Sequence, residues 1–195
     1  MFPERTNRHI LSAALASMRP GADIDLPRLI AAICRRKAVA RLPRRPETTL
    51  DSGCQLLLDY SATMVPFWDD LTGLVDQVTR VVGADATRVY SFDIRPTQAR
   101  RWTPSGKPEP WVPDGRPVLA ATDLGIQGRA GSAAPDPDWT RLADACLAAG
   151  SPLLILIPWP EERWPRAFPG GVALIHWGPR TTAGMMRRHR GNAAP

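Results

Sequence analysis

Between residues 54 and 177 the chain alternates short, almost wholly apolar segments with longer amphipathic ones, and this alternation constrains the fold most. The apolar segments are CQLLLDY (54–60), RVYSFD (88–93), PVLAATD (117–123), PLLILIPW (152–159) and VALIHW (172–177). Most of them lack the apolar–polar alternation of a strand that faces water on one side. They are therefore typical of strands that are buried on both faces.

Amphipathic segments separate these strands. Residues 66–82 carry apolar side chains at helical spacing, and the similar segment 139–150 ends at a glycine. Buried strands that alternate with such helices predict a mainly parallel sheet with helices on both faces. We therefore predict an α/β fold for residues 51–178, with a doubly wound, Rossmann-like sheet.

The first 34 residues are expected to form a helical extension. Residues 6–18 have apolar side chains at helical spacing up to a proline–glycine pair that stops the helix. A second helix is predicted over 26–36, where Asp25 can cap it. The two segments together predict a helical hairpin. The apolar stripe of the second helix consists of Leu26, Leu29, Ile30 and Ile33.

Two basic segments flank the predicted sheet. Residues 35–50 are expected to form an extended arm rich in proline and arginine, and residues 179–195 a flexible basic tail. The net charge of +6 and a pI near 10 permit binding to nucleic acid, although such runs are also common as solvated or protein-binding surfaces. The candidate phosphate contacts are Arg35, Arg36, Lys37, Arg41, Arg44, Arg45, Arg187, Arg188 and Arg190.

Hard oxygen ligands follow two of the predicted strands. Asp59 ends the first strand, Ser61 and Thr63 follow it at alternate positions, and Asp123 ends the third strand. Ligands bind at the carboxyl ends of the strands in doubly wound sheets, and this donor set suits Mg²⁺, Mn²⁺ or Ca²⁺. The alternative is that the first three residues cap the helix that starts near Pro66, and that the later acid forms a turn.

The stretch DYSAT (59–63) resembles the DxSxS motif of the metal-ion-dependent adhesion site in von Willebrand factor A (vWA) domains. In that family the motif ends the first strand and precedes a long helix, and a later acid completes the site. TDLG (122–125) is similar to that later element. The resemblance covers roughly residues 52–178, and it implies a vWA-like domain with a metal held by Asp59, Ser61, Thr63 and Asp123.

The chain departs from the vWA pattern at two points. Its third motif position is Thr63, where the family has serine. The family also supplies a further threonine from a loop between the two motifs. The corresponding segment here, residues 94–116, offers only Thr97, Thr103 or Ser105.

A narrower resemblance extends over nearly the whole chain. The succession RLPRRP, QLLLDYSATMVPFWDDL, RVVG, ATDLG and LILIPWPEERWP is similar to the vWA-like modules of bacterial conflict systems. That resemblance implies a non-catalytic adaptor, sensor or scaffold in a defence-type complex. Its partners would be signalling NTPases, proteases or reverse-transcriptase-type proteins. The alternative is a nucleic-acid-binding accessory subunit that uses the arginine-rich segments.

The seven tryptophans offer a second kind of candidate site. Aromatic and arginine side chains dominate the energetics of protein interfaces. The same residues could instead pack a rigid surface loop over the sheet. The candidate partner-binding residues are Trp159, Trp164, Arg163, Trp102 and Trp111.

Several functional classes lack support in the sequence. There is no glycine-rich phosphate loop and no Ser-His-Asp or Cys-His arrangement, so we expect no enzymatic activity; a metal-dependent hydrolase using Asp59 and Asp123 is the remaining alternative. Three widely spaced cysteines predict neither disulfides nor a zinc site. No apolar run reaches the roughly 18 residues of a membrane span, so we expect a cytoplasmic protein without a membrane partner.

Overall fold

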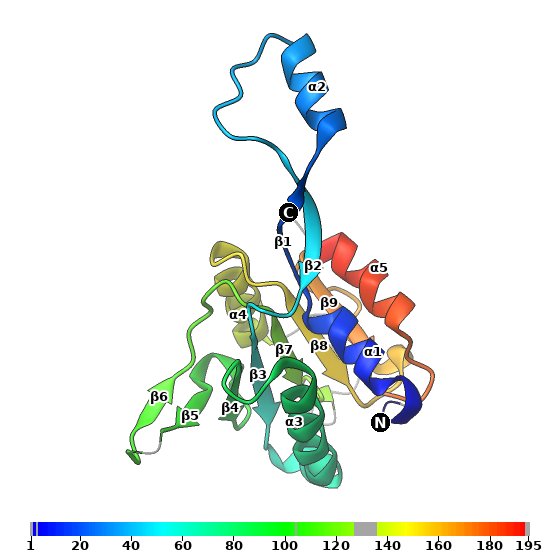
Figure 1. Cartoon of the computed structure of the whole chain (residues 1–195). Coiled ribbons are helices and arrows are strands. Elements are labelled where there is room, and N and C mark those ends of the chain that lie inside the picture. Colours follow the sequence, from blue (N-terminus) through cyan, green and yellow to red (C-terminus); the bar gives the residue numbers. More distant parts are fainter. Residues whose placement is uncertain (1, 3, 104, 127–135, 194–195) are drawn as a thin grey trace.

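The structure is a computed structural model that describes residues 2, 4–103, 105–126 and 136–193 (Figure 1). The side chains of residues 4, 102 and 189–193 lie outside that description. The helices and strands follow in the order α1 (Glu4–Leu15), β1 (Ser17–Ile24), α2 (Leu26–Cys34), β2 (Arg44–Thr49), β3 (Cys54–Asp59), η1 (Ala62–Phe67), α3 (Trp68–Val82), β4 (Thr87–Phe92), η2 (Pro96–Gln98), β5 (Arg100–Trp102), β6 (Pro108–Pro110), β7 (Val118–Ala121), α4 (Pro137–Ala148), β8 (Leu153–Ile157), η4 (Glu161–Arg163), β9 (Val172–His176) and α5 (Ala183–Ala193).

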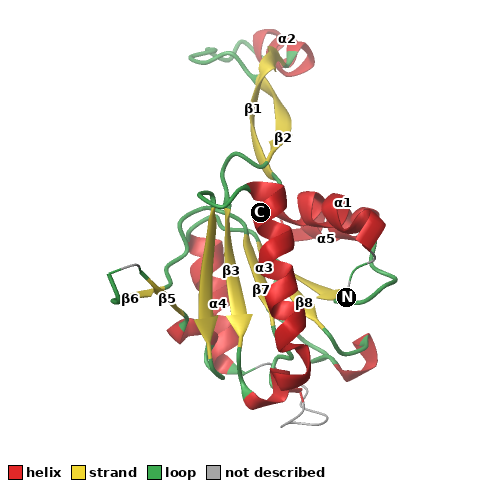
Figure 2. Cartoon of the chain, turned by 60° about the horizontal axis from the view of Figure 1, so that its bottom comes forward, coloured by secondary structure: helices red, strands yellow, loops and turns green. Residues whose placement is uncertain are grey.

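A seven-stranded sheet with the order β6-β5-β4-β3-β7-β8-β9 forms the body of the protein. The five strands from β4 to β9 in that order pair in parallel, whereas β5 and β6 form an antiparallel extension at one edge. Helices α1, α3 and α5 cover one face and α4 covers the other (Figure 2). The predicted α/β fold with a mainly parallel sheet and helices on both faces is confirmed, and the arrangement is compatible with a Rossmann-like sheet.

The central strands are apolar because both of their faces are covered. All six residues of β3 and all five of β8 are buried. Leu56 and Leu58 pack into the cluster beneath α1, α3 and α5, while Leu57 between them packs into the cluster beneath α4. Each buried leucine side chain stabilises the fold by about 1.5–3 kcal/mol relative to an exposed one.

The predicted N-terminal helical hairpin is wrong. Helix α1 packs on the body, but the chain then enters β1, which pairs with β2 in a two-stranded antiparallel ribbon. Helix α2 sits at the far end of this ribbon, away from α1 (Figures 1 and 2). The strands SMRPGADI and RRPETT are mostly polar and contain prolines, so they have no apolar periodicity that predicts them. Strands β1 and β2 form through backbone pairing with each other, although they are far apart in the sequence.

Two further expectations about the basic segments need correction. The arm over residues 35–50 is extended as expected, but its second half is the regular strand β2. The segment expected to be a flexible tail contains helix α5, which packs on β9 and α1 through the fully buried Met186. One buried methionine among arginines leaves little amphipathic pattern in the sequence. None of the helices in the described part of the chain is long and apolar enough to cross a lipid bilayer.

Candidate metal centre at the carboxyl edge of the sheet

The candidate site lies where the chain reverses its direction of winding. Strands β3 and β7 are neighbours, yet the helix after β3 covers one face of the sheet and the helix after β7 covers the other. The carboxyl ends of two such strands leave a crevice between their diverging connections, which is the usual binding site of doubly wound folds. Asp59 is the last residue of β3, and Asp123 lies two residues beyond the end of β7.

Asp59 is a buried carboxylate held in place by two hydrogen bonds. Its Oδ1 accepts the backbone N–H of Ser61 at 2.9 Å, and its Oδ2 accepts the hydroxyl of Thr122 at 2.7 Å. Burial, with only 3% of the residue exposed, raises the pKa of Asp59 above its ordinary value. Hydrogen bonds from Thr122 and Ser61 lower the pKa, and the nearby carboxylate of Asp123 raises it further. The geometry is therefore suited to a bound positive charge, which would favour the ionised form.

Ser61 and Thr63 turn toward each other rather than toward the helix. Ser61 Oγ and Thr63 Oγ1 lie 3.1 Å apart. Ser61 occupies the N-terminal cap of η1, but its side chain makes no capping hydrogen bond. Capping therefore does not account for the hydroxyl of Ser61. The backbone N–H of Ser61 donates to Asp59 Oδ1.

Only one of the two carboxylate oxygens of Asp123 has a hydrogen-bond partner in the described structure. It is 0% exposed, and its Oδ1 accepts the backbone N–H of Gly125 at 2.8 Å, as expected for a turn former. Its Oδ2 is buried and has no hydrogen-bond partner among the described residues. A buried carboxylate oxygen without a partner is costly, and buried charges in proteins are normally paired or bound to metal. The turn thus explains one oxygen of Asp123, and the other has no partner in the described part of the chain.

Thr122 is a site residue that the sequence reasoning did not select. It is fully buried; its hydroxyl donates to Asp59 and accepts the backbone N–H of Leu124 at 3.0 Å. Its only signal in the sequence is its position next to Asp123. Of the three candidate hydroxyls in residues 94–116, those of Thr103 and Ser105 bond to each other in the turn between β5 and β6, and Thr97 lies in η2.

The site therefore assembles two carboxylates and three hydroxyls, all hard oxygen donors, from Asp59, Ser61, Thr63, Thr122 and Asp123. Such a set fits Mg²⁺, Mn²⁺ or Ca²⁺. Over residues 2–126 and 136–193, as far as they are described, no group of three or more His, Cys, Asp or Glu could hold a metal ion. A cation at this site would rely on the hydroxyls, and on water or a second molecule, for its remaining ligands.

An aromatic loop packs beside the candidate centre. The ring of Trp159, just beyond β8, meets Phe67 of η1 edge-on with a centroid separation of 5.7 Å. Trp164 donates its ring N–H to the carbonyl of Trp159 at 2.8 Å, and the guanidinium of Arg163 lies 5.1 Å from the Trp159 ring centre. Arg163 is exposed and both tryptophans are half-buried. The loop is therefore both packed and partly available for contact.

The other two tryptophans of the predicted partner surface are not part of this loop. Trp111 is buried in the cluster beneath α4, and its ring N–H donates to Gln55 Oε1 at 3.1 Å. It acts as a core residue, so its prediction as a partner contact is wrong. The side chain of Trp102 lies outside the described part of the chain.

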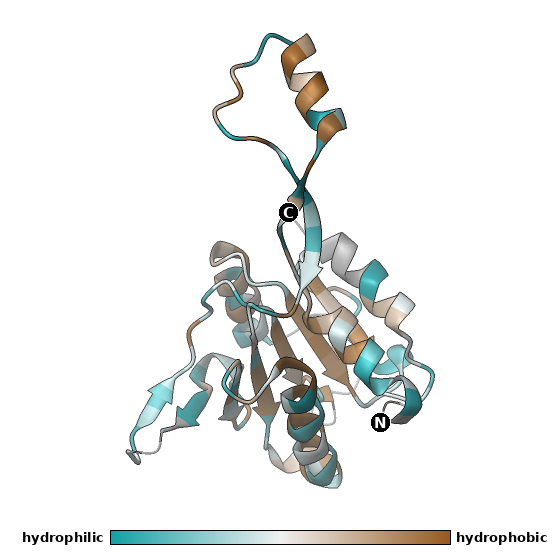
Figure 3. Ribbon diagram, in the orientation of Figure 1, coloured by the Kyte–Doolittle hydropathy of each residue, from teal (hydrophilic) through white to brown (hydrophobic). Residues whose placement is uncertain are grey.

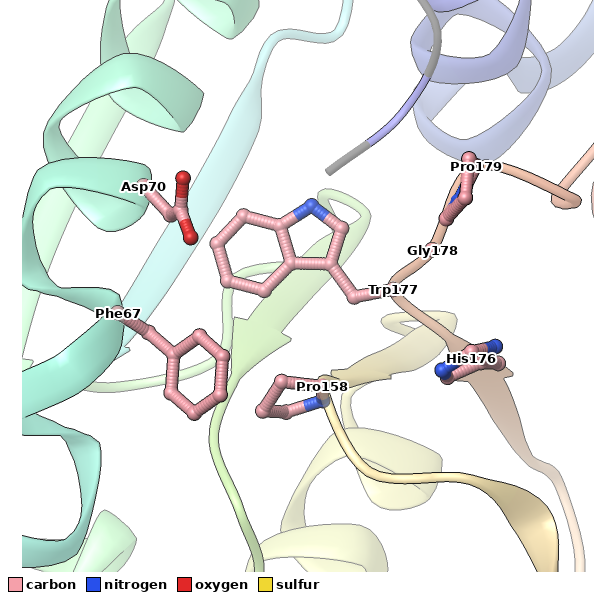
Figure 4. Close-up of a pocket in the computed structure, with 7 residues that line it drawn as sticks. All are labelled: Phe67, Asp70, Pro158, His176, Trp177, Gly178 and Pro179. Atoms are coloured by element: carbon pink, nitrogen blue, oxygen red, sulfur yellow. The ribbon is translucent and has the colours of Figure 1, made fainter.

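A cavity of about 230 Å³ opens at the ends of β8 and β9 (Figure 4). Phe67 borders both this cavity and the aromatic loop, which joins the cavity to the segment that follows Ser61 and Thr63. The volume is smaller than the roughly 300–1,000 Å³ of typical small-molecule sites. The lining residues are Phe67, Asp70, Pro158, His176, Trp177, Gly178 and Pro179.

The predicted nucleic-acid contacts lie away from the candidate centre. The ribbon that carries most of them joins the body just before the amino end of β3, whereas Asp59 lies at the carboxyl end. Two others, Arg187 and Arg188, are exposed on α5, and the side chain of Arg190 is not described. The contacts on the ribbon side are all exposed: Arg35, Arg36, Lys37, Arg41, Arg44 and Arg45.

Comparisons with protein-family models, with curated proteins and with solved structures found no significant match to this chain. Its function is therefore inferred from the geometry of its own sites.

Proposed function

We propose that the protein is a vWA-like, non-catalytic interaction module that uses a cation at the carboxyl edge of its sheet to bind a partner protein. The observation that carries this proposal is the buried Oδ2 of Asp123, which has no hydrogen-bond partner among the residues that the structure describes, beside the buried carboxylate of Asp59. Two buried acids at the switch point of a doubly wound sheet call for a positive charge between them.

Asp59, Ser61, Thr63 and Asp123 would hold the cation. The metal supplies two positive charges that offset the two carboxylates, and it leaves coordination positions that water or a partner can fill. An acidic side chain of the partner is the natural ligand for such a position. The exposed guanidinium of Arg163 and the half-buried Trp159 lie beside this edge and would provide the surrounding contact surface.

The contacts of the two acids favour binding over hydrolysis. Asp59 and Asp123 are bonded to hydroxyls and backbone amides, and no Lys or His is among the hydrogen-bond partners described for them. Burial raises the pKa of Cys54 to about 11 and that of Cys146 to about 12, so neither thiol is a nucleophile at neutral pH.

The resemblance to vWA-like modules of bacterial conflict systems suggests the setting. In that setting the protein is a cytoplasmic adaptor, sensor or scaffold, and its partner is a signalling NTPase, a protease or a reverse-transcriptase-type protein. This setting rests on the resemblance alone; the mainly parallel sheet with Asp59 and Asp123 at its carboxyl edge is compatible with it.

Capture of partners from the source cells tests the proposal. The tagged full chain is incubated with lysate in Mg²⁺ or in EDTA, alongside Asp59→Ala and Asp93→Asn. Asp93 is the matched control because it is an exposed acid that follows β4 at the same edge. We expect one protein to be recovered by the wild type and by Asp93→Asn in Mg²⁺, and to be lost in EDTA and with Asp59→Ala. Equal recovery in all four samples contradicts the proposal.

A further inference from the structure

The segment of residues 25–45, which we call the tip, stands apart from the body. It contains α2 and the loop that returns to β2, and the β1–β2 ribbon carries it away from the sheet (Figures 1 and 2). None of the residues of α2 is buried. The tip therefore adds nothing to the core, and its composition needs another explanation.

The tip exposes a stripe of aliphatic side chains. Leu26, Ile30 and Ile33 are 55%, 58% and 60% exposed, and they occupy positions i, i+4 and i+7 of α2. Figure 3 colours much of this helix as hydrophobic. The same spacing is used by helices that insert one face into a groove of another protein. Leu42 in the returning loop adds a further exposed aliphatic group.

The tip also carries the net charge of the chain. Residues 25–45 contain seven basic residues and one acidic residue, so their formal charge of +6 equals that of the whole protein. The remaining residues are balanced. A surface that complements the tip is therefore acidic. Two tips from separate copies of the chain would repel each other.

Hydrogen bonds join the two ends of the tip and cap its helix. Asp25 donates its backbone N–H to the carbonyl of Pro43 at 2.8 Å, and its side chain accepts the N–H of Arg28 at 3.0 Å, which caps α2. Lower on the ribbon, Arg19 bonds to Glu47 at 2.7 Å and to Asp51 at 2.6 Å. A helix that is already folded and capped avoids much of the ordering cost of binding.

We propose that the tip is a docking helix that inserts Leu26, Ile30 and Ile33 into an apolar groove with an acidic rim on a partner protein. Nucleic acid would match the charge but would leave the aliphatic stripe in water. Helices that lie on membranes are rich in Lys and Arg on their own polar face and often carry Trp or Phe on the apolar face, whereas α2 has one basic residue, Arg28, and no aromatic residue. The tip and the carboxyl edge lie at opposite ends of β3, so the protein could hold two partners at once.

Binding of the full chain to three probes tests this inference. Calcium-loaded calmodulin represents an acidic protein with an apolar groove, a short DNA duplex represents nucleic acid, and phosphatidylserine vesicles represent an anionic membrane. All three are measured at the same physiological salt. We expect calmodulin to bind most tightly. DNA or vesicles binding more tightly than calmodulin, or no binding to calmodulin, overturns the proposal.

Matched variants separate the aliphatic stripe from the charge. Ile30→Gln combined with Ile33→Gln keeps a helix-forming residue at each position and should weaken calmodulin binding at least about tenfold. Leu147→Gln is the control, because Leu147 is an equally exposed leucine (56%) on α4. Arg35→Gln with Arg36→Gln should weaken binding about threefold to tenfold at low salt. Equal affinity of the double isoleucine variant and the wild type overturns the proposal, as does self-association that this variant abolishes.

Discussion

The carboxyl edge of the sheet buries polar atoms, whereas the tip exposes apolar side chains, and both arrangements are unusual in proteins. At the carboxyl edge, polar atoms are withdrawn from water, and Asp123 keeps a buried oxygen without a partner in the described structure. At the tip, apolar side chains are left in water, with Ile30 and Ile33 more than half exposed. Both arrangements cost free energy in the isolated chain, and a different kind of ligand would relieve each of them.

The comparison leads to a different proposed partner for each region. In the proposed account a cation offsets the charge of the two buried acids, and water or a partner supplies its remaining oxygen ligands. An exposed aliphatic stripe among arginines needs an apolar surface with acidic surroundings. If both proposals hold, the chain connects two other molecules from opposite ends of β3.

The largest expected effect is on the free energy of unfolding, which a substitution in the body should lower much more than a substitution in the tip. Leu156→Ala removes a fully buried side chain from β8 and should lower the free energy of unfolding by about 2–5 kcal/mol. Ile30→Ala should change it by no more than about 0.5 kcal/mol, because α2 has no buried residue. Urea denaturation measures both. A large loss with Ile30→Ala would mean that the tip belongs to the cooperative core.

A smaller effect is expected for the hydroxyl that supports Asp59. Thr122→Val keeps the shape of the side chain but removes the hydrogen bond to a buried carboxylate, and it should lower the free energy of unfolding by about 1–3 kcal/mol. Thr72→Val is the control, because its hydroxyl bonds to a carbonyl on the exposed surface of α3. Equal stability of the two variants would show that Asp59 does not depend on Thr122.

The smallest effect concerns pH. Because burial raises the folded-state pKa of Asp59, the folded protein binds a proton more tightly than the unfolded chain does. The stabilisation that the protonated carboxyl of Asp59 contributes is therefore fully present below the unfolded pKa of about 3.9. It is lost as the pH rises through the folded pKa. In EDTA, the stability of the wild type relative to Asp59→Asn should fall as the pH rises from about 4 toward neutrality. Urea midpoints over that pH range measure the difference, and a constant difference would contradict the raised pKa.

The sequence predicts the body better than the ribbon for a physical reason. Strands β3 and β8 are continuous apolar runs because helices cover both faces, so composition alone indicates them. The meeting of Asp59 and Asp123 follows from the same topology. Thr122 could not be selected in this way, because its role depends on the partner of one hydroxyl in the folded protein.

The ribbon and α5 lack such signals. Strands β1 and β2 are held by backbone pairing and by contacts such as that between Arg19 and Glu47, which no local pattern reveals. The position of α2 at the end of the ribbon follows from that pairing. Helix α5 depends on burial of Met186 against α1 and the sheet, a contact between the two ends of the chain.

The central claim is that the acids at the carboxyl edge hold a divalent cation, and calorimetric titration with Mg²⁺ and Mn²⁺ tests it most directly. The full chain, freed of metal with EDTA and dialysed, is compared with Asp123→Asn and with the control Asp93→Asn. We predict one saturable site per chain in the wild type and in Asp93→Asn, with affinity reduced at least about tenfold in Asp123→Asn. Absence of saturable binding in the wild type, or equal binding by Asp123→Asn, would contradict the account.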